Sequence, residues 1–220
     1  MFKVDVHTHI LPPTWPDLSE RYGTPGFPGF ERQPDGSAHM MVDCKHFRTF
    51  QPNSWDPAAR LQDCERDHVD VQVLSTVPIM FSYWAKPAHA ADLSRILNDH
   101  IAATVAEHPT RFVGLATVPM QDSALAIREL ERAMKELGLA GVEIGTHIDG
   151  MNLNDPQLFP FFEAAADLGA AVFVHPWDMM GKNEIRRYWL PWLVSMPAET
   201  SRAICSMIFG GVFERLPALR

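Results

Sequence analysis

The chain has 220 residues, of which 46% are hydrophobic and 21% are charged, an ordinary composition for a folded domain with a large core. Its formal net charge is −8 and it has no basic cluster, which argues against nucleic acid or an anionic membrane as a partner. Three widely spaced cysteines, Cys44, Cys64 and Cys205, indicate reduced thiols and a cytoplasmic protein, and the N-terminus shows no signal-peptide pattern.

The first predicted element is a strand over residues 2–9. Successive strand side chains point to opposite faces, so His7 and His9 share one face, about 7 Å apart along the strand. Pro12 and Pro13 follow, and the strand is expected to end before them because proline cannot donate to a ladder. Two imidazoles at a strand end can bind one metal ion, whereas an edge strand with a solvated polar face is the alternative interpretation.

Residues 11–55 show no regular period and are rich in proline and glycine. A stretch of this length without regular structure is uncommon inside a compact domain, so it predicts a functional loop or a small insertion. Residues 38–50 within it are compatible with a short hairpin.

From Asp56 onward, helical and apolar strand-like segments alternate. Asp56 and Pro57 predict the start of one helix, and Asp122 or Ser123 the start of another. The predicted helices cover residues 57–69, 88–107, 122–137 and 155–168, and the predicted strands cover 71–76, 112–117, 141–145 and 171–175. The last 45 residues predict a loop and one or two helices, including residues 198–209.

Apolar strands that alternate with helices indicate an α/β fold with a parallel sheet covered by helices. Two architectures fit, an open doubly wound sheet and a (β/α)8 TIM barrel. The turn after the first strand lacks the glycines of a nucleotide-binding turn, which favours the barrel. A full barrel takes about 250 residues. We therefore expect residues 1–220 to be the N-terminal part of a single barrel domain, with five β/α units, an insertion at about 11–55 and further strands beyond residue 220.

Catalytic groups of a barrel collect at the C-terminal ends of its strands. His7 and His9 close the first predicted strand and His175 closes the fifth. Three imidazoles suit a catalytic zinc ion that keeps one position open. His147 follows the fourth strand and is a weaker candidate for a supporting position, and Asp178 is expected to be a structural hydrogen-bond acceptor.

Several short blocks resemble a known family. His7-Thr8-His9 followed by Ile-Leu-Pro resembles the opening of the amidohydrolase superfamily, in its decarboxylase branch. Further blocks are similar to one enzyme of that branch and extend along the whole chain, at residues 74–78, 80–87, 143–147, 174–179, 188–193 and 196–200.

The resemblance implies a cytoplasmic zinc enzyme that removes CO2, without an oxidant, from an aminocarboxymuconate semialdehyde in tryptophan (kynurenine-type) or nitrobenzoate catabolism. It implies His7, His9 and His175 as zinc ligands. An aspartate ligand and a general-base histidine are expected beyond Arg220, so that no other catalytic residue lies within 1–220. The resemblance further implies Arg48, Lys45 and Trp189 as substrate-binding residues, and a homodimer in which a neighbouring subunit supplies an arginine.

Two other functions remain open. A sibling hydrolase, hydratase or aromatic-acid decarboxylase of the same superfamily would have the same metal ligands. For the 220-residue stretch alone, a non-catalytic zinc-binding or dimerisation module is the alternative.

Overall fold

The computed structural model describes all 220 residues, and its centre is one five-stranded parallel sheet. The strands are β1 (Val4–His9), β5 (Val71–Ser75), β6 (Phe112–Ala116), β7 (Gly141–Gly145) and β10 (Ala171–His175), adjacent in that order. A doubly wound sheet would reverse its order at a switch point. Because the order here never reverses, the sheet is an arc of a barrel, which confirms the predicted fold class.

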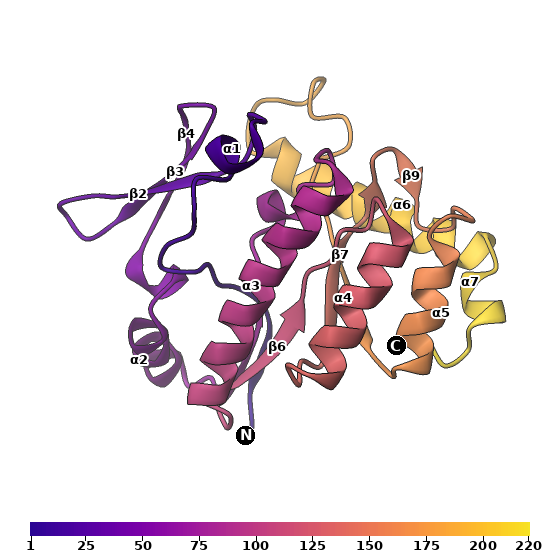
Figure 1. Cartoon of the computed structure of the whole chain (residues 1–220), viewed down its shortest axis with the longest axis horizontal. Coiled ribbons are helices and arrows are strands. Elements are labelled where there is room, and N and C mark those ends of the chain that lie inside the picture. Colours follow the sequence, from indigo (N-terminus) through magenta and orange to yellow (C-terminus); the bar gives the residue numbers. More distant parts are fainter.

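Helices connect the strands and cover one face of this sheet. They are α2 (Pro57–Asp67), α3 (Pro87–Glu107), α4 (Ser123–Lys135) and α5 (Phe159–Asp167). Helix α4 packs between α3 and α5, and the three stand in a row in front of the sheet (Figure 1). The other face of the sheet carries His7, Glu143 and His175, and Phe173 packs beside His7 on it.

Local capping explains where two of these helices begin. The carboxylates of Asp56 and Asp122 accept hydrogen bonds from the first turns of α2 and α4, which confirms both predicted starts. Helix α5 begins at Phe159, four residues after the predicted start at Asp155. The Asp155 carboxylate instead accepts a hydrogen bond from the Gln157 N–H, which closes a local turn in place of a helix cap.

The predicted insertion is a folded part of the structure. It contains α1 (Leu18–Tyr22) and an antiparallel sheet of β2 (Gly29–Arg32), β3 (Ala38–Val42) and β4 (Lys45–Phe50), which projects from one end of the molecule (Figure 1). Strands β3 and β4 form the predicted hairpin. A second hydrophobic cluster, which includes Leu18 and Met40, anchors the insertion to α3.

The remaining elements are short or lie at the C-terminal end. Two short 3-10 helices, η1 (Pro52–Ser54) and η2 (Pro78–Phe81), precede α2 and α3, and a small hairpin of β8 (His147–Ile148) and β9 (Met151–Asn152) follows β7. A π-helical turn, η3 (Pro191–Ser195), leads into α6 (Met196–Phe209) and α7 (Val212–Arg215). No helix of the structure combines the length and the apolar character that crossing a bilayer requires.

The main hydrophobic core lies between the sheet and its helices. Val142 and Ile144 of β7 and Phe161 and Phe162 of α5 are fully buried there. Alternate residues of the same strands face the interior of the arc, and this alternation places Glu143 between two apolar neighbours. The arc therefore has an apolar core under the helices and, on its inner face, a mixture of apolar side chains such as Phe173 and polar ones such as Glu143 and His175.

Candidate metal centre

Three histidines converge at the C-terminal ends of β1 and β10. The Nε2 atoms of His7 and His175 lie 2.8 Å apart, and one nitrogen from each of His7, His9 and His175 lies within 4.8 Å of the other two. The chain separates His7 from His175 by 168 positions, so the parallel arrangement of the two strands is what brings them together. The predicted convergence of these three imidazoles is confirmed.

The strands determine how each imidazole is presented. The register between β1 and β5 shifts between Asp5 and Thr8, an irregularity that turns the end of β1. His175 pairs in register with Gly145 at the last position of β10. His7 is exposed, His9 is half-buried and His175 is buried, so the three rings form a site that opens to solvent on one side.

Hydrogen bonds at the Nδ1 atoms define the tautomers of His9 and His175. Nδ1 of His175 donates to the carbonyl oxygen of Pro176, 2.6 Å away. The Ser75 hydroxyl donates to the carbonyl oxygen of Thr8, so its oxygen accepts from Nδ1 of His9 at 3.2 Å. Both rings therefore keep a lone pair on Nε2, the arrangement by which metal-ligating histidines are oriented.

Electrostatics keep these two rings in the neutral form that binds a metal. Burial, together with the nearby His175 and His7, lowers the pKa of His9 to about 3. Burial also lowers the pKa of His175 to about 4, against the opposing effect of its hydrogen bond to Pro176. Three converging imidazoles fit a divalent cation such as zinc, and His9 and His175, whose Nε2 lone pairs are free, can act as ligands without first losing a proton.

A carboxyl group that sequence reasoning missed lies beneath the histidines. Glu143 is fully buried, and its Oε1 atom lies 3.9 Å from Nδ1 of His9. Burial raises the pKa of Glu143 well above its ordinary value, so the neutral acid is the favoured form. The signal in the sequence was a single charged residue inside an apolar five-residue strand.

A hollow of about 470 Å³ adjoins the three histidines. Its walls come from β4, from the segment after β5 and from the segment after β10, and they include Arg48, Trp84, Trp177 and Trp192. Of the residues predicted to bind substrate, Arg48 lines this hollow, whereas Lys45 and Trp189 lie outside its lining and are exposed. Apolar walls with one cationic group suit an organic anion.

Asp178 and the histidines outside the three-histidine group form contacts with neighbouring side chains. Asp178 forms an ion pair with Lys182 (2.5 Å), as expected of a structural acceptor, although it also borders the hollow. His147 packs against the Trp177 ring and its Nε2 atom lies 3.6 Å from Oε1 of Glu199. His39 and His46 pack edge to face in the small sheet, outside the lining of the hollow beside the three histidines.

Arg220, the residue beyond which the general base is expected, lies far from the three histidines along β10. Its carbonyl oxygen accepts a hydrogen bond from the N–H of Val172 at 2.9 Å, near the N-terminal end of β10, whereas His175 closes the C-terminal end. Arg220 is exposed and borders a separate, mostly apolar hollow of about 330 Å³ that also contains Phe173 and Met207. Arg220 therefore takes no part in the three-histidine site, and the general-base histidine and the aspartate expected after it stay predictions.

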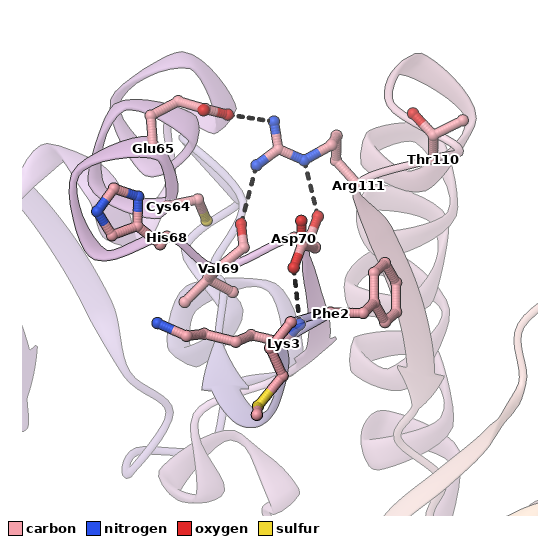
Figure 2. A pocket seen from close by; sticks show the side chains of 10 residues that line it. Phe2, Lys3, Cys64, Glu65, His68, Val69, Asp70, Thr110 and Arg111 are labelled. Carbon is pink, nitrogen blue, oxygen red and sulfur yellow. Dashed lines mark hydrogen bonds and ion pairs between the residues drawn. The ribbon is translucent and has the colours of Figure 1, made fainter.

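A larger hollow of about 690 Å³ lies at the opposite, N-terminal ends of the strands (Figure 2). Arg111 lines this hollow, and Figure 2 shows its guanidinium bonded to Glu65, Val69 and Asp70. It binds the Glu65 carboxylate at 2.5 Å and donates to the carbonyl oxygens of Asp70 (2.8 Å) and Val69 (3.1 Å). Because these bonds occupy the guanidinium, and because barrel enzymes work at the other end of their strands, this hollow is not the candidate site.

A parallel β/α arc with three imidazoles at its strand ends defines a metal-binding protein of the barrel class. The chain belongs to the amidohydrolase family, whose family model matches residues 4–220. It is 57% identical to a 2-amino-3-carboxymuconate-6-semialdehyde decarboxylase of Dictyostelium discoideum, over 99% of this chain and 61% of that protein. It is 36% identical to the enzyme of the same name from Caenorhabditis elegans, over 99% of this chain and 67% of the relative.

A solved structure extends the comparison. The fold matches 5-carboxyvanillate decarboxylase from Sphingomonas paucimobilis with a TM-score of 0.77 and 27% identity, over 100% of this chain and 66% of that one. The chain thus spans about three fifths to two thirds of the length of these relatives.

Proposed function

We propose that the whole protein is a zinc-dependent decarboxylase that converts 2-amino-3-carboxymuconate 6-semialdehyde to 2-aminomuconate 6-semialdehyde, a step of tryptophan (kynurenine-type) or nitrobenzoate catabolism. The observation that carries the proposal is the group of three converging imidazoles beside a hollow that contains Arg48. The activity for which the Dictyostelium and Caenorhabditis relatives are named supports the choice of reaction.

In this proposal the metal is held by His7, His9 and His175 together with residues beyond Arg220. Zinc bound in this way would lower the pKa of a coordinated water to about 7 and so make a base available near neutral pH. The chain's own contribution is to keep His9 and His175 neutral and oriented, through Ser75 and the Pro176 carbonyl.

Arg48 is proposed to bind a carboxylate of the substrate. Its guanidinium is exposed on β4, forms no salt bridge and borders the hollow that holds the histidines. Arginine can bind a carboxylate through two parallel hydrogen bonds. Such a grip would orient the substrate, so that the carbon that loses CO2 faces the metal centre.

We further propose a cytoplasmic homodimer. Cys44, Cys64 and Cys205 are all free thiols, which supports a reducing compartment. Tyr188, Trp189 and Leu193 form an exposed apolar surface around η3, 69–79% exposed, which supports association of subunits. Sedimentation of the full-length protein tests the oligomeric state, and a monomer at micromolar concentration would contradict it.

The decisive experiment uses the full-length protein. It should consume the semialdehyde with release of one CO2 per turnover, lose activity on chelation and regain it with zinc. Turnover of a carboxylated phenol with no turnover of the semialdehyde would instead assign an aromatic-acid decarboxylase, the activity of the Sphingomonas relative. Zinc binding without turnover of either compound would favour the non-catalytic module.

A further inference from the structure

A buried carboxylate on α6 holds the segment that follows β10. The side chain of Glu199 is completely inaccessible to solvent. Its Oε1 atom accepts hydrogen bonds from the backbone N–H groups of Trp177 (3.1 Å) and Asp178 (3.4 Å), and its Oε2 atom accepts from the N–H of Met180 (3.2 Å). The Thr146 hydroxyl, at the end of β7, also donates to Oε1. One carboxylate thus joins three parts of the chain.

The backbone of this segment is shaped as an anion-binding concavity. Successive N–H groups converge on one acceptor when a residue adopts the left-handed conformation within such a turn. Met179 does so, with φ at 59°, which a residue other than glycine adopts only at an energetic cost. The carboxylate of Glu199 occupies the concavity and offsets that cost with bonds from charged acceptor to backbone donor, which are stronger than neutral ones.

The charge state of Glu199 agrees with this role. Burial by itself raises the pKa of a carboxyl group, yet the hydrogen bonds from Thr146, Trp177 and Asp178 outweigh it, and the pKa of Glu199 lies below its ordinary value. The group is therefore an anion over the physiological pH range. Glu143, also inaccessible to solvent, accepts no hydrogen bond from a backbone N–H group, and burial raises its pKa.

The segment held by Glu199 forms one wall of the candidate site. Pro176, Trp177, Asp178 and Met179 directly follow His175 and line the hollow beside the three histidines. Trp177 also donates from Nε1 to the carbonyl oxygen of His147 and packs edge-on against Tyr83. The carboxylate itself lies behind this wall, outside the lining of the hollow.

We propose that Glu199 is a positioning residue for the substrate: through the three N–H groups of Trp177, Asp178 and Met180 it sets one wall of the hollow that Arg48 also lines. This inference rests on the proposed function for its kinetic consequence, but its structural half stands on the contacts alone. Without the carboxylate, three backbone N–H groups lose their acceptor, and the left-handed conformation of Met179 is no longer stabilised. Residues 177–180 therefore become more mobile, while β10 and His175 keep their place in the sheet.

The test uses the full-length zinc-loaded protein with Glu199→Gln, which keeps the shape but places an amide N–H group against a backbone donor. Glu163→Gln on the exposed face of α5 is the matched control. A second pair of variants changes only one hydrogen bond to this carboxylate. Thr146→Val removes the hydroxyl that donates to Glu199, whereas Thr146→Ser retains a hydroxyl and should behave as wild type.

Amide hydrogen exchange is the direct measurement. In Glu199→Gln we expect the amides of residues 177–180 to exchange about tenfold to a hundredfold faster, as the loss of hydrogen bonds to a charged group implies, with the β-strands unchanged. Zinc content should stay at the wild-type level, and KM for the semialdehyde should rise about tenfold, more than kcat falls. The Glu163→Gln control should match wild type in every measurement.

The outcomes separate the two proposals. Unchanged exchange at residues 177–180 in both Glu199→Gln and Thr146→Val would overturn the positioning role. A uniform increase over all peptides would overturn it too, because it would show that Glu199 supports only global stability. Faster local exchange with wild-type KM would refute the link to the substrate. A wild-type protein that does not decarboxylate would refute the proposed function, and exchange would still decide the role of Glu199.

Discussion

Gly145 offers the sharpest test of how the wall of the site is packed. A Cβ atom at this position would lie 2.6 Å from Cδ1 and 2.7 Å from Nε1 of Trp177, and 3.0 Å from Cε2 of Tyr83. Contacts this short do not occur between relaxed carbon atoms, so the Trp177 ring has to move. Gly145→Ala should therefore destabilise the protein by about 1–3 kcal/mol, the usual cost of overpacking.

Thermal unfolding measures this effect. A cost of that size corresponds to a fall in Tm of about 2–12 °C for a domain of this size. Gly29→Ala is the matched control, because its Cβ would meet no atom within 4 Å and its φ is not in the left-handed region. Trp177→Leu should relieve the clash, so that Gly145→Ala costs less in that background than in wild type. Equal Tm values for Gly145→Ala and Gly29→Ala would refute the packing described here.

The other predictions concern single side chains. His7→Ala and His175→Ala should both lose bound metal by elemental analysis, and stoichiometric metal in both variants would contradict the three-histidine site. Arg48→Ala and Arg48→Lys should keep full metal while kcat/KM falls about tenfold to a hundredfold. The reason is that a charge-assisted hydrogen bond is worth about 1.5–3 kcal/mol and that lysine lacks the two parallel N–H donors of the guanidinium. Wild-type kinetics in Arg48→Ala would show that Arg48 is a surface residue without a role in substrate binding. Burial lowers the pKa of His100 on α3, so the neutral ring is favoured by folding, and its contribution to stability is present above about pH 6.5 and is lost as the pH falls below that value. In urea unfolding, His100→Leu should lose less stability than wild type between pH 7 and pH 5, and an equal loss in the two proteins would contradict this effect of burial.

Much of the barrel arc was predictable because its signals are local. The strands at residues 141–145 and 171–175 match the predicted bounds, since each is an apolar run that follows a glycine-terminated helix. Asp56 and Asp122 were predicted as caps because a backbone N–H two or three positions along the chain completes the interaction. His7 and His9 were predictable as neighbours because strand alternation alone places them on one face.

The three strands of the insertion were less accessible to sequence reasoning. Only the hairpin at residues 38–50 was predicted, because its turn is local, whereas β2 pairs with β3 across a longer connection. The buried residues Leu18, Phe27 and Met40 of the insertion are far apart in sequence, and they are brought together by packing against α3. The burial of His100 has no local signal either: it is half-buried because the side of α3 that carries it packs toward the segment after β1.

By itself, the sequence determined the order of the strands and helices, the presence of two imidazoles on one strand face, and a third at the end of the fifth strand. The tertiary structure alone decided that the Nε2 atoms of His7 and His175 meet at 2.8 Å, that Glu143 lies unpartnered beneath His9, and that Glu199 reaches the backbone after β10. These features depend on residues far apart in the chain. Local propensities specify which element forms, whereas only the register and packing of the elements specify which side chains share a common point in space.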